Sequence, residues 1–317
     1  MIKKLNTLCV VVILLSVFSI NVEGADLYNN AFKKSRRSSS GGPQFLLGAG
    51  SSTFLGDLGG KPTLGSDDIS DIDLSTIRYV VSAGLRIPFS RTIALRLTSA
   101  YTRLGGDDKY TINPERRGRN LNFKTGLFEG SVALEFSFGS NKRFYCYGGI
   151  GYALFKPFTT YNGTKVYLQP LGTEGQNYLQ GKQPYGLTTT IYPFGLGYRI
   201  PAGSGQITFE LAMRKSTTDY IDDVSTKFAD PALVAASAPS GSGATAAALA
   251  DRSISDIPGF SSPGSIRGDP TDNDNYFFII VYYHFPLSSG GNNGSFGSKG
   301  KRGKGNFFGT KRKCIEF

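Results

Sequence analysis

The chain has 317 residues and a formal net charge of +11 at pH 7, and its aromatic residues are all Phe or Tyr because Trp is absent. Three cysteines are too few for the disulfide framework of a small secreted domain. Glycine occupies 41 positions without a fixed period, which excludes collagen and fits turns and closely packed strands.

The first 24 residues are predicted to be a secretory signal peptide. Lys3 and Lys4 precede an apolar run over residues 8–20, and small residues follow before Ala25. This run is too short to span a bilayer, which takes about 20 helical residues. We therefore expect an exported protein without a transmembrane helix. Export argues against nucleic acid as the partner of this basic chain.

Eight segments with alternating apolar and polar residues are predicted to be strands. In the second segment Tyr79, Val81 and Leu85 share one face, while Ser82 and Arg86 share the other. Most segments are close to the length of a tilted transmembrane strand, about 9–11 residues. In chain order the predicted strands cover residues 44–56, 76–87, 92–104, 120–138, 143–155, 187–200, 206–215 and 276–285.

The connections between these strands alternate between long and short. Residues 88–91, 139–142 and 201–204 are the short ones. Long outer loops and short periplasmic turns are typical of outer-membrane barrels. We therefore predict an all-β fold, an eight-stranded antiparallel transmembrane β-barrel over residues 44–287 with long extracellular loops. The even strand count places both chain ends in the periplasm. A secreted β-sandwich would also show short strands, but it would not require this parity.

Charged residues on the polar strand faces are predicted to fill the barrel lumen. An eight-stranded barrel is just wide enough for side chains. Charges in so narrow a space should pair, because an unpaired buried charge costs several kcal/mol. The predicted ion-pair plug comprises Arg78, Arg86, Arg96, Glu129, Glu135, Glu210 and Arg214. Such a plug argues against a conducting pore.

The sequence offers little for catalysis. His284 is the single histidine, and its place beside Phe285 at the end of the last strand is typical of an interfacial aromatic belt. The chain has no H-E-x-x-H motif and no nucleotide-binding loop. The glycines within residues 148–151 fall inside a strand, where they indicate close packing or a bend. We predict no enzyme activity and no cofactor.

The long loops are acidic in patches. Oxygen ligands of this kind could hold Ca²⁺, but the spacing is not that of a known calcium motif, so a solvated surface is the favoured interpretation. The residues concerned are Asp67, Asp68, Asp71, Asp73, Asp107, Asp108, Asp219, Asp222 and Asp223. The fourth loop also carries a run of small residues, which indicates either a mobile segment or a short helix over residues 244–250.

Basic segments flank the barrel on both sides. Residues 25–43 form a basic N-terminal segment, and residues 288–317 form a Gly/Lys-rich tail that we expect to be disordered in the periplasm. A flexible cationic arm suits an acidic protein surface or anionic lipid, although a solvated tail without a partner is the alternative. The predicted partner-docking residues are Lys299, Lys301, Arg302, Lys304, Lys311, Arg312 and Lys313.

Four phrases of the sequence resemble one family. They are STFLGDLGG at 52–60, RNLNFKT at 119–125, PLGTEGQ at 170–176 and TTDYIDDVST at 217–226. In this order they resemble the PorG-like outer-membrane barrels of Bacteroidetes, over residues 44–287. The resemblance implies a non-enzymatic subunit of the type IX secretion system, which also serves gliding motility. Its expected partners are outer-membrane lipid and a periplasmic ring built from a lipoprotein and a partner protein. A stand-alone anchoring or adhesion barrel, whose loops bind something outside, is the alternative.

Overall fold

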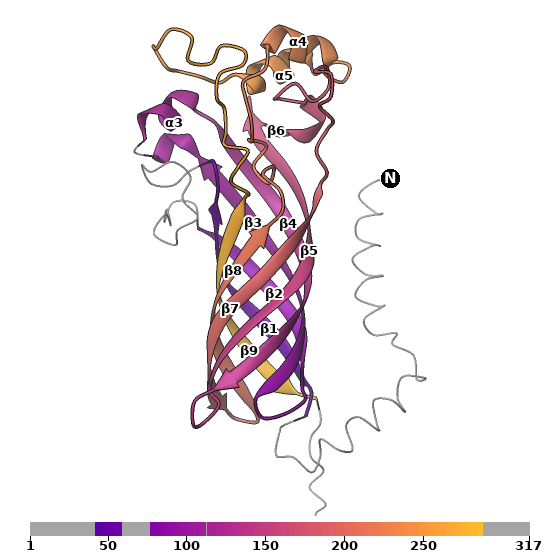
Figure 1. Cartoon of the computed structure of the whole chain (residues 1–317), viewed down its shortest axis with the longest axis vertical. Coiled ribbons are helices and arrows are strands. Elements are labelled where there is room, and N and C mark those ends of the chain that lie inside the picture. Colours follow the sequence, from indigo (N-terminus) through magenta and orange to yellow (C-terminus); the bar gives the residue numbers. More distant parts are fainter. Residues whose placement is uncertain (1–41, 59–76, 112, 288–317) are drawn as a thin grey trace, which may run out of the picture.

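The chain forms a closed antiparallel β-barrel of eight strands in the computed structural model (Figure 1). The structure describes residues 42–58, 77–111 and 113–287, so the predicted signal peptide and the basic tail lie outside the described residues. The barrel strands are β1 Gln44–Leu55, β2 Arg78–Pro88, β3 Ile93–Asp107, β4 Asn122–Phe138, β5 Phe144–Tyr161, β7 Thr188–Ala202, β8 Gly205–Ser216 and β9 Asn275–Pro286. Pairing of β1 with β9 and of β4 with β5 closes the ring.

The eight predicted strands are confirmed, with small differences at their ends. The largest difference is in β5, which was expected to end at residue 155 and instead continues to Tyr161. Its last residues pair with the short strand β6, Thr164–Tyr167, in a hairpin that rises beyond the barrel. In the described ranges, no helix has both the length and the apolar character needed to cross a membrane.

The two ends of the barrel differ in their connections. Residues 89–92, 139–143 and 203–204 join strands at one end, which we call the turn end. Gly203 has a φ of +60°, in the left-handed region that glycine adopts without strain. Both chain ends of the barrel also meet here, since the Leu287 amide donates to the carbonyl of Pro43 at 2.9 Å. The long connections lie at the opposite end, the loop end (Figure 1).

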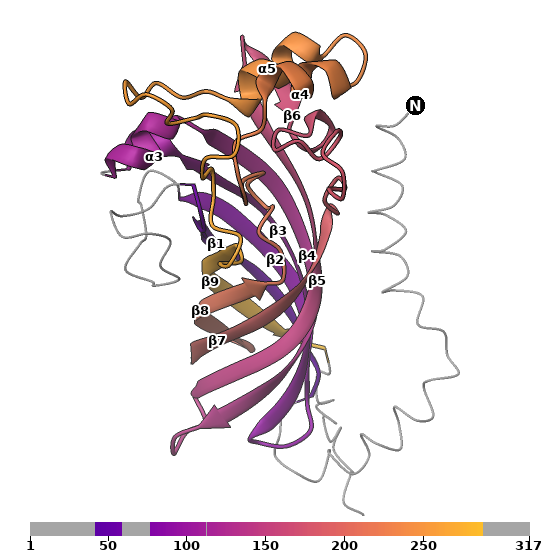
Figure 2. The same cartoon turned by 45° about the horizontal axis from the view of Figure 1, so that its top comes forward.

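The long connections fold together into what we call the loop cap, the described residues of 56–58, 108–121, 162–187 and 217–274. It contains the helices α3 Pro114–Arg119, α4 Pro231–Ser237 and α5 Gly243–Ala250, with short 3₁₀ turns at Asp108–Tyr110 and Gln169–Leu171. Figure 2 shows these helices gathered at the loop end. The cap has an apolar interior, which includes Ile221, Val234 and Leu249 and is continuous with the interior of the barrel. Of the two alternatives for residues 244–250, a mobile segment or a short helix, the structure has the helix, α5.

The outer wall of the barrel is a band of exposed apolar side chains. A band of this extent would promote aggregation in water but is the surface that a bilayer requires. Aromatic pairs such as Phe138 with Phe144 and Tyr79 with Tyr101 lie towards the two ends of this band, as interfacial girdles do. The wall is therefore that of a transmembrane barrel of the outer-membrane type. The band includes Leu47, Val81, Leu97, Val132, Leu134, Phe136, Ile150, Tyr152, Leu154, Phe194, Leu196, Phe209, Leu211, Ile279 and Val281.

Candidate functional site

The middle of the lumen is crossed by a buried ion pair between opposite walls. Arg96 on β3 places Nη1 2.6 Å from Oε2 of Glu210 on β8, and these strands stand four positions apart in the ring of eight. Tyr145 and Tyr147 donate their hydroxyls to the same carboxylate at 2.7 and 2.9 Å. The Arg96 guanidinium also lies 4.5 Å from the ring centroid of Tyr147, a cation–π contact.

A glycine on β7 makes this cluster possible. A Cβ atom at Gly197 would stand 2.2 Å from Cζ of Tyr145, a separation that no real side chain adopts. The glycine therefore leaves the space that the Tyr145 ring occupies when its hydroxyl donates to Glu210. A turn glycine is needed because it can adopt a positive φ. Gly197 is needed because it has no side chain to collide with Tyr145.

A second ion pair lies nearer the loop end. Arg214 on β8 places Nε 3.0 Å from Oε1 of Glu129 on β4. Tyr276 donates its hydroxyl to the other oxygen of Glu129 at 2.6 Å. The Arg214 guanidinium lies 4.3 Å from the ring centroid of Phe278. Both charged groups are almost fully buried, so each depends on the other and on the tyrosine.

A third cluster closes the lumen near the turn end. Glu135 on β4 accepts from Arg86 on β2 at 2.7 Å and also pairs with Arg199 on β7. Arg199 donates in addition to the hydroxyl of Ser137 at 3.0 Å. Glu135 is thus held between two guanidiniums, which offset the cost of burying its charge.

Six of the seven residues predicted for the plug lie inside the barrel and form three ion pairs with one another. Arg78 is different, because it is half-buried at the first residue of β2, where its guanidinium donates to the carbonyl of Ile77. Arg199 was missed, although its two-residue spacing from Gly197 places it on the inner face. With Arg199 the described lumen holds four arginines against three glutamates.

The assignment of His284 to an interfacial belt was wrong. Its side chain is 1% exposed and lies inside the lumen, within hydrogen-bond distance of the Thr208 hydroxyl at 2.9 Å and of Gln44 at 3.2 Å. The alternation of β9 gives the reason. Tyr282 and His284 share the inner face, whereas Phe285 points outwards.

The expectation that the acidic loop residues form a solvated surface was also wrong for most of those described. Asp108, Asp219, Asp222 and Asp223 are buried in the loop cap, while Asp107 remains half-buried. Two of the buried aspartates make ion-pair or hydrogen-bond contacts that the sequence did not predict. Asp108 pairs with Arg119 at 2.9 Å, and Asp223 accepts from the Thr173 hydroxyl at 2.6 Å. Asp67, Asp68, Asp71 and Asp73 lie outside the described residues.

Some of the buried carboxylates in the cap carry raised pKa values. Burial, with the neighbouring charge of Asp222 second, raises the pKa of Asp219 to about 10. Burial raises the pKa of Asp57 to about 6 and holds those of Asp222 and Asp274 well above their ordinary value. At neutral pH Asp219 therefore favours its protonated form, whereas Asp57 stays mostly ionised. Within the described ranges no three acidic, histidine or cysteine side chains are placed to hold a metal ion.

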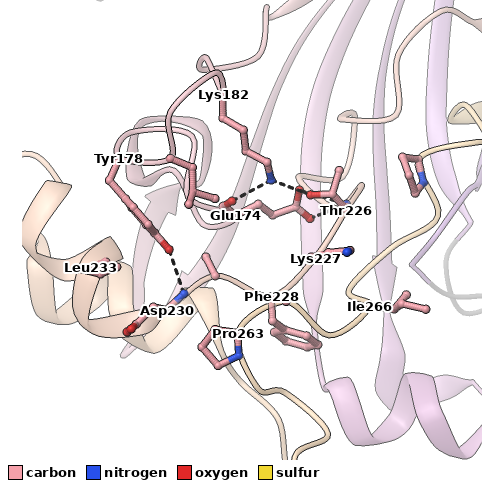
Figure 3. Close-up of a pocket in the computed structure, with 14 residues that line it drawn as sticks. Glu174, Tyr178, Lys182, Thr226, Lys227, Phe228, Asp230, Leu233, Pro263 and Ile266 are labelled. Atoms are coloured by element: carbon pink, nitrogen blue, oxygen red, sulfur yellow. Dashed lines mark hydrogen bonds between the residues drawn. The ribbon is translucent and has the colours of Figure 1, made fainter.

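The loop cap also contains a pocket of about 580 Å³ (Figure 3). Apolar side chains form most of its wall, among them Phe228, Leu233 and Ile266. Three hydrogen bonds shape its rim. The Lys182 ammonium donates to the carbonyl of Glu174 at 3.0 Å and to the Thr226 hydroxyl at 2.8 Å. The Asp230 amide donates to the Tyr178 hydroxyl at 3.0 Å.

Comparison with known proteins gives architectural similarity only. The chain is similar to Ail, the attachment invasion locus protein of Yersinia pestis, with 11% sequence identity and a TM-score of 0.35. The match covers 78% of this chain and 99% of that chain. The chain is also similar to Neisserial surface protein A, with 10% identity, coverage of 78% and 99%, and a TM-score of 0.33. No family model and no curated protein matches the chain.

Proposed function

We propose that the chain is a non-enzymatic outer-membrane subunit of the type IX secretion machinery that docks a periplasmic ring complex to the outer membrane. The observation that carries this proposal is the lumen, which ion pairs cross at three levels between non-adjacent strands. A solute could pass only by breaking pairs that cost several kcal/mol each to disrupt. Because the lumen does not conduct, we expect the protein to bind its partners at the two ends of the barrel. The family resemblance then assigns the periplasmic role.

The histidine supports a non-enzymatic role. His284 has Thr208 and Gln44 as its hydrogen-bond partners inside the lumen. Nucleophilic catalysis by histidine needs a nucleophile that substrate can reach and a third group that orients the ring. Among the described residues, His284 is buried too deeply to meet a lipid substrate.

The docking end is proposed to be the turn end. The short turns and both chain ends of the barrel lie there, so the tail of residues 288–317 begins at that end. This tail has seven Lys and Arg residues against one Glu. Cationic residues at this density favour capture of an acidic protein surface at ordinary ionic strength.

A pull-down from native outer membranes in mild detergent tests the proposal. Tagged full-length protein should bring down the ring lipoprotein and its partner, and removal of residues 288–317 should release them. Neutralising Lys299, Lys301 and Lys304 to Gln should weaken recovery. The matched control neutralises three exposed lysines of the other end, Lys109, Lys124 and Lys165, and should leave recovery unchanged.

Two outcomes would count against the docking role. If the ring proteins come down equally with and without the tail, the barrel or its turns hold the ring instead. If neither form brings down ring proteins, secretion docking is refuted. Single-channel recording in planar bilayers tests the closed lumen separately, and a steady conductance from the unaltered protein would refute it.

A second function is favoured by one observation, the ordered loop cap with its pocket. A stand-alone anchoring or adhesion barrel would use this end to bind something outside the cell. In that case the cap, and not the tail, determines the partner. Deleting residues 288–317 would then leave both secretion and loop-end binding intact.

A further inference from the structure

The pocket of the loop cap presents large aliphatic side chains to solvent. Ile266 is 79% exposed, Leu233 49% and Leu179 40%. All three line the same cavity, together with the buried ring of Phe228. Single exposed apolar residues need no explanation, but several that converge on one cavity favour a ligand that covers them.

The polar groups of the pocket are unevenly satisfied. The Glu174 carboxylate is fully engaged, since it pairs with Arg267 at 3.0 Å and accepts from the Thr226 hydroxyl at 2.7 Å. The Asp230 carboxylate caps α4 by accepting from the Ala232 amide. Lys182 uses two of its three N–H groups on protein acceptors.

Among the charged groups that line the pocket, the two lysines, Lys182 and Lys227, outweigh the single carboxylate of Asp230 once Glu174 is paired with Arg267. With Glu174 neutralised by Arg267, the Lys182 ammonium keeps one donor for a ligand. Lys227 adds a second, exposed ammonium at the edge of the same cavity. Figure 3 shows Lys182 and Lys227 on one side of the pocket and Leu233, Phe228 and Pro263 around the rest. This arrangement matches a molecule with one anionic end and one apolar end.

We propose that the cap pocket binds a small anionic amphiphile, an acyl chain with a single carboxylate. Its volume of about 580 Å³ falls in the range of small-molecule sites. The walls are mainly aliphatic and carry few directional polar groups, which suits a plain acyl chain better than a polar ring. Lys182 and Lys227 hold the carboxylate, while Leu233 and Ile266 cover the chain. This inference does not rest on the docking role, which concerns the opposite end.

Methyl NMR on the full-length protein in nanodiscs tests the proposal, with octanoate below its micelle-forming concentration as the probe. The Ile266 methyl signal should shift and saturate. Two internal controls separate other effects: Ile150 faces lipid and reports partition into the bilayer, and Ile254 is exposed on the cap outside the pocket lining. A shift of Ile254 parallel to that of Ile266 would mean general adsorption and would overturn the proposal.

A lysine variant and an uncharged ligand then separate the contribution of the carboxylate from that of the alkyl chain. Lys227→Gln should weaken octanoate binding by up to about fivefold, the upper limit for an exposed ion pair. Lys165→Gln, an exposed lysine outside the pocket, should not change it. Octanol should bind more weakly than octanoate and should be insensitive to Lys227→Gln. Equal affinities for octanol and octanoate would overturn the anionic part. If the Ile266 signal saturates with a peptide that carries both apolar and acidic residues but does not respond to octanoate, the pocket is a protein-docking site and the proposal is overturned.

Discussion

The substitution Glu210→Gln tests the middle of the lumen, because it removes one charge and almost no volume. Arg96 would then keep its charge at 2% exposure without the carboxylate that lies 2.6 Å away. Breaking a buried pair by removing one partner costs about 3–5 kcal/mol. The two tyrosine hydroxyls can reorient towards the new amide, so their loss adds at most about 1 kcal/mol. We expect the free energy of unfolding to fall by about 3–5 kcal/mol.

Urea titration of the barrel in lipid vesicles measures this change. The chain lacks Trp, so circular dichroism or tyrosine fluorescence follows unfolding. Glu115→Gln, on the exposed face of α3, is the control and should change stability by no more than about 0.5 kcal/mol. The double variant Arg96→Met with Glu210→Gln should recover much of the loss, because removal of both partners leaves no orphan charge. A single-variant loss below about 1 kcal/mol, or a double variant less stable than the single, would refute the reasoning.

Three further outcomes follow from the same structure. Gly197→Ala should destabilise the barrel by about 1–3 kcal/mol in the same titration, because the new Cβ meets Tyr145, and an unchanged midpoint would contradict this. Arg199→Met should cost less than Arg86→Met, because Arg86 donates a hydrogen bond to the shared carboxylate whereas Arg199 only pairs with it in charge, and the lumen has one arginine in excess; the reverse order would count against it. The pKa of Asp219 is raised from 3.8 to about 10, so its contribution to cap stability is full below pH 4 and is lost as the pH rises towards 10, by up to about 1.4 kcal/mol per pH unit. Hydrogen exchange of cap amides, corrected for intrinsic rates, should therefore accelerate between pH 6 and 9, and Asp219→Asn should reduce this dependence, the remainder coming from Asp222 and Asp274.

The barrel was predictable because its chemistry repeats along the chain. A two-residue alternation fixes which side chains face inwards, so Arg96 and Glu210 could be assigned to the lumen before any partner was known. The same rule assigns His284 inwards, and the error there came from weighting its aromatic neighbour above the alternation. Arg199 was missed because the inner face of β7 before it carries Ile191, Pro193 and Gly197, so the contrast between a polar and an apolar face is weak along this strand.

The loop cap was not predictable in the same way. Its residues follow no period, and its ion pairs join positions far apart in the chain, as in Arg267 with Glu174, which are 93 residues apart. The buried aspartates illustrate the difficulty. Asp222 and Asp223 look like solvated loop residues until the loops fold against one another and enclose them. Only the α5 helix could be anticipated, because a run of alanines has a strong local preference.

The ion pairs of the lumen also constrain the order of assembly. Arg96 and Glu210 are 114 residues apart, and Arg214 and Glu129 are 85 apart. Each pair joins β3 or β4 to β8. Neither pair can therefore form before β8 has joined the sheet and the barrel has closed. A half-built sheet would turn its unmatched arginines and glutamates towards lipid, where charge is expensive. The first strands must therefore stay sheltered from the bilayer until β8 and β9 arrive, and the pairing of these last two barrel strands commits the barrel to insertion.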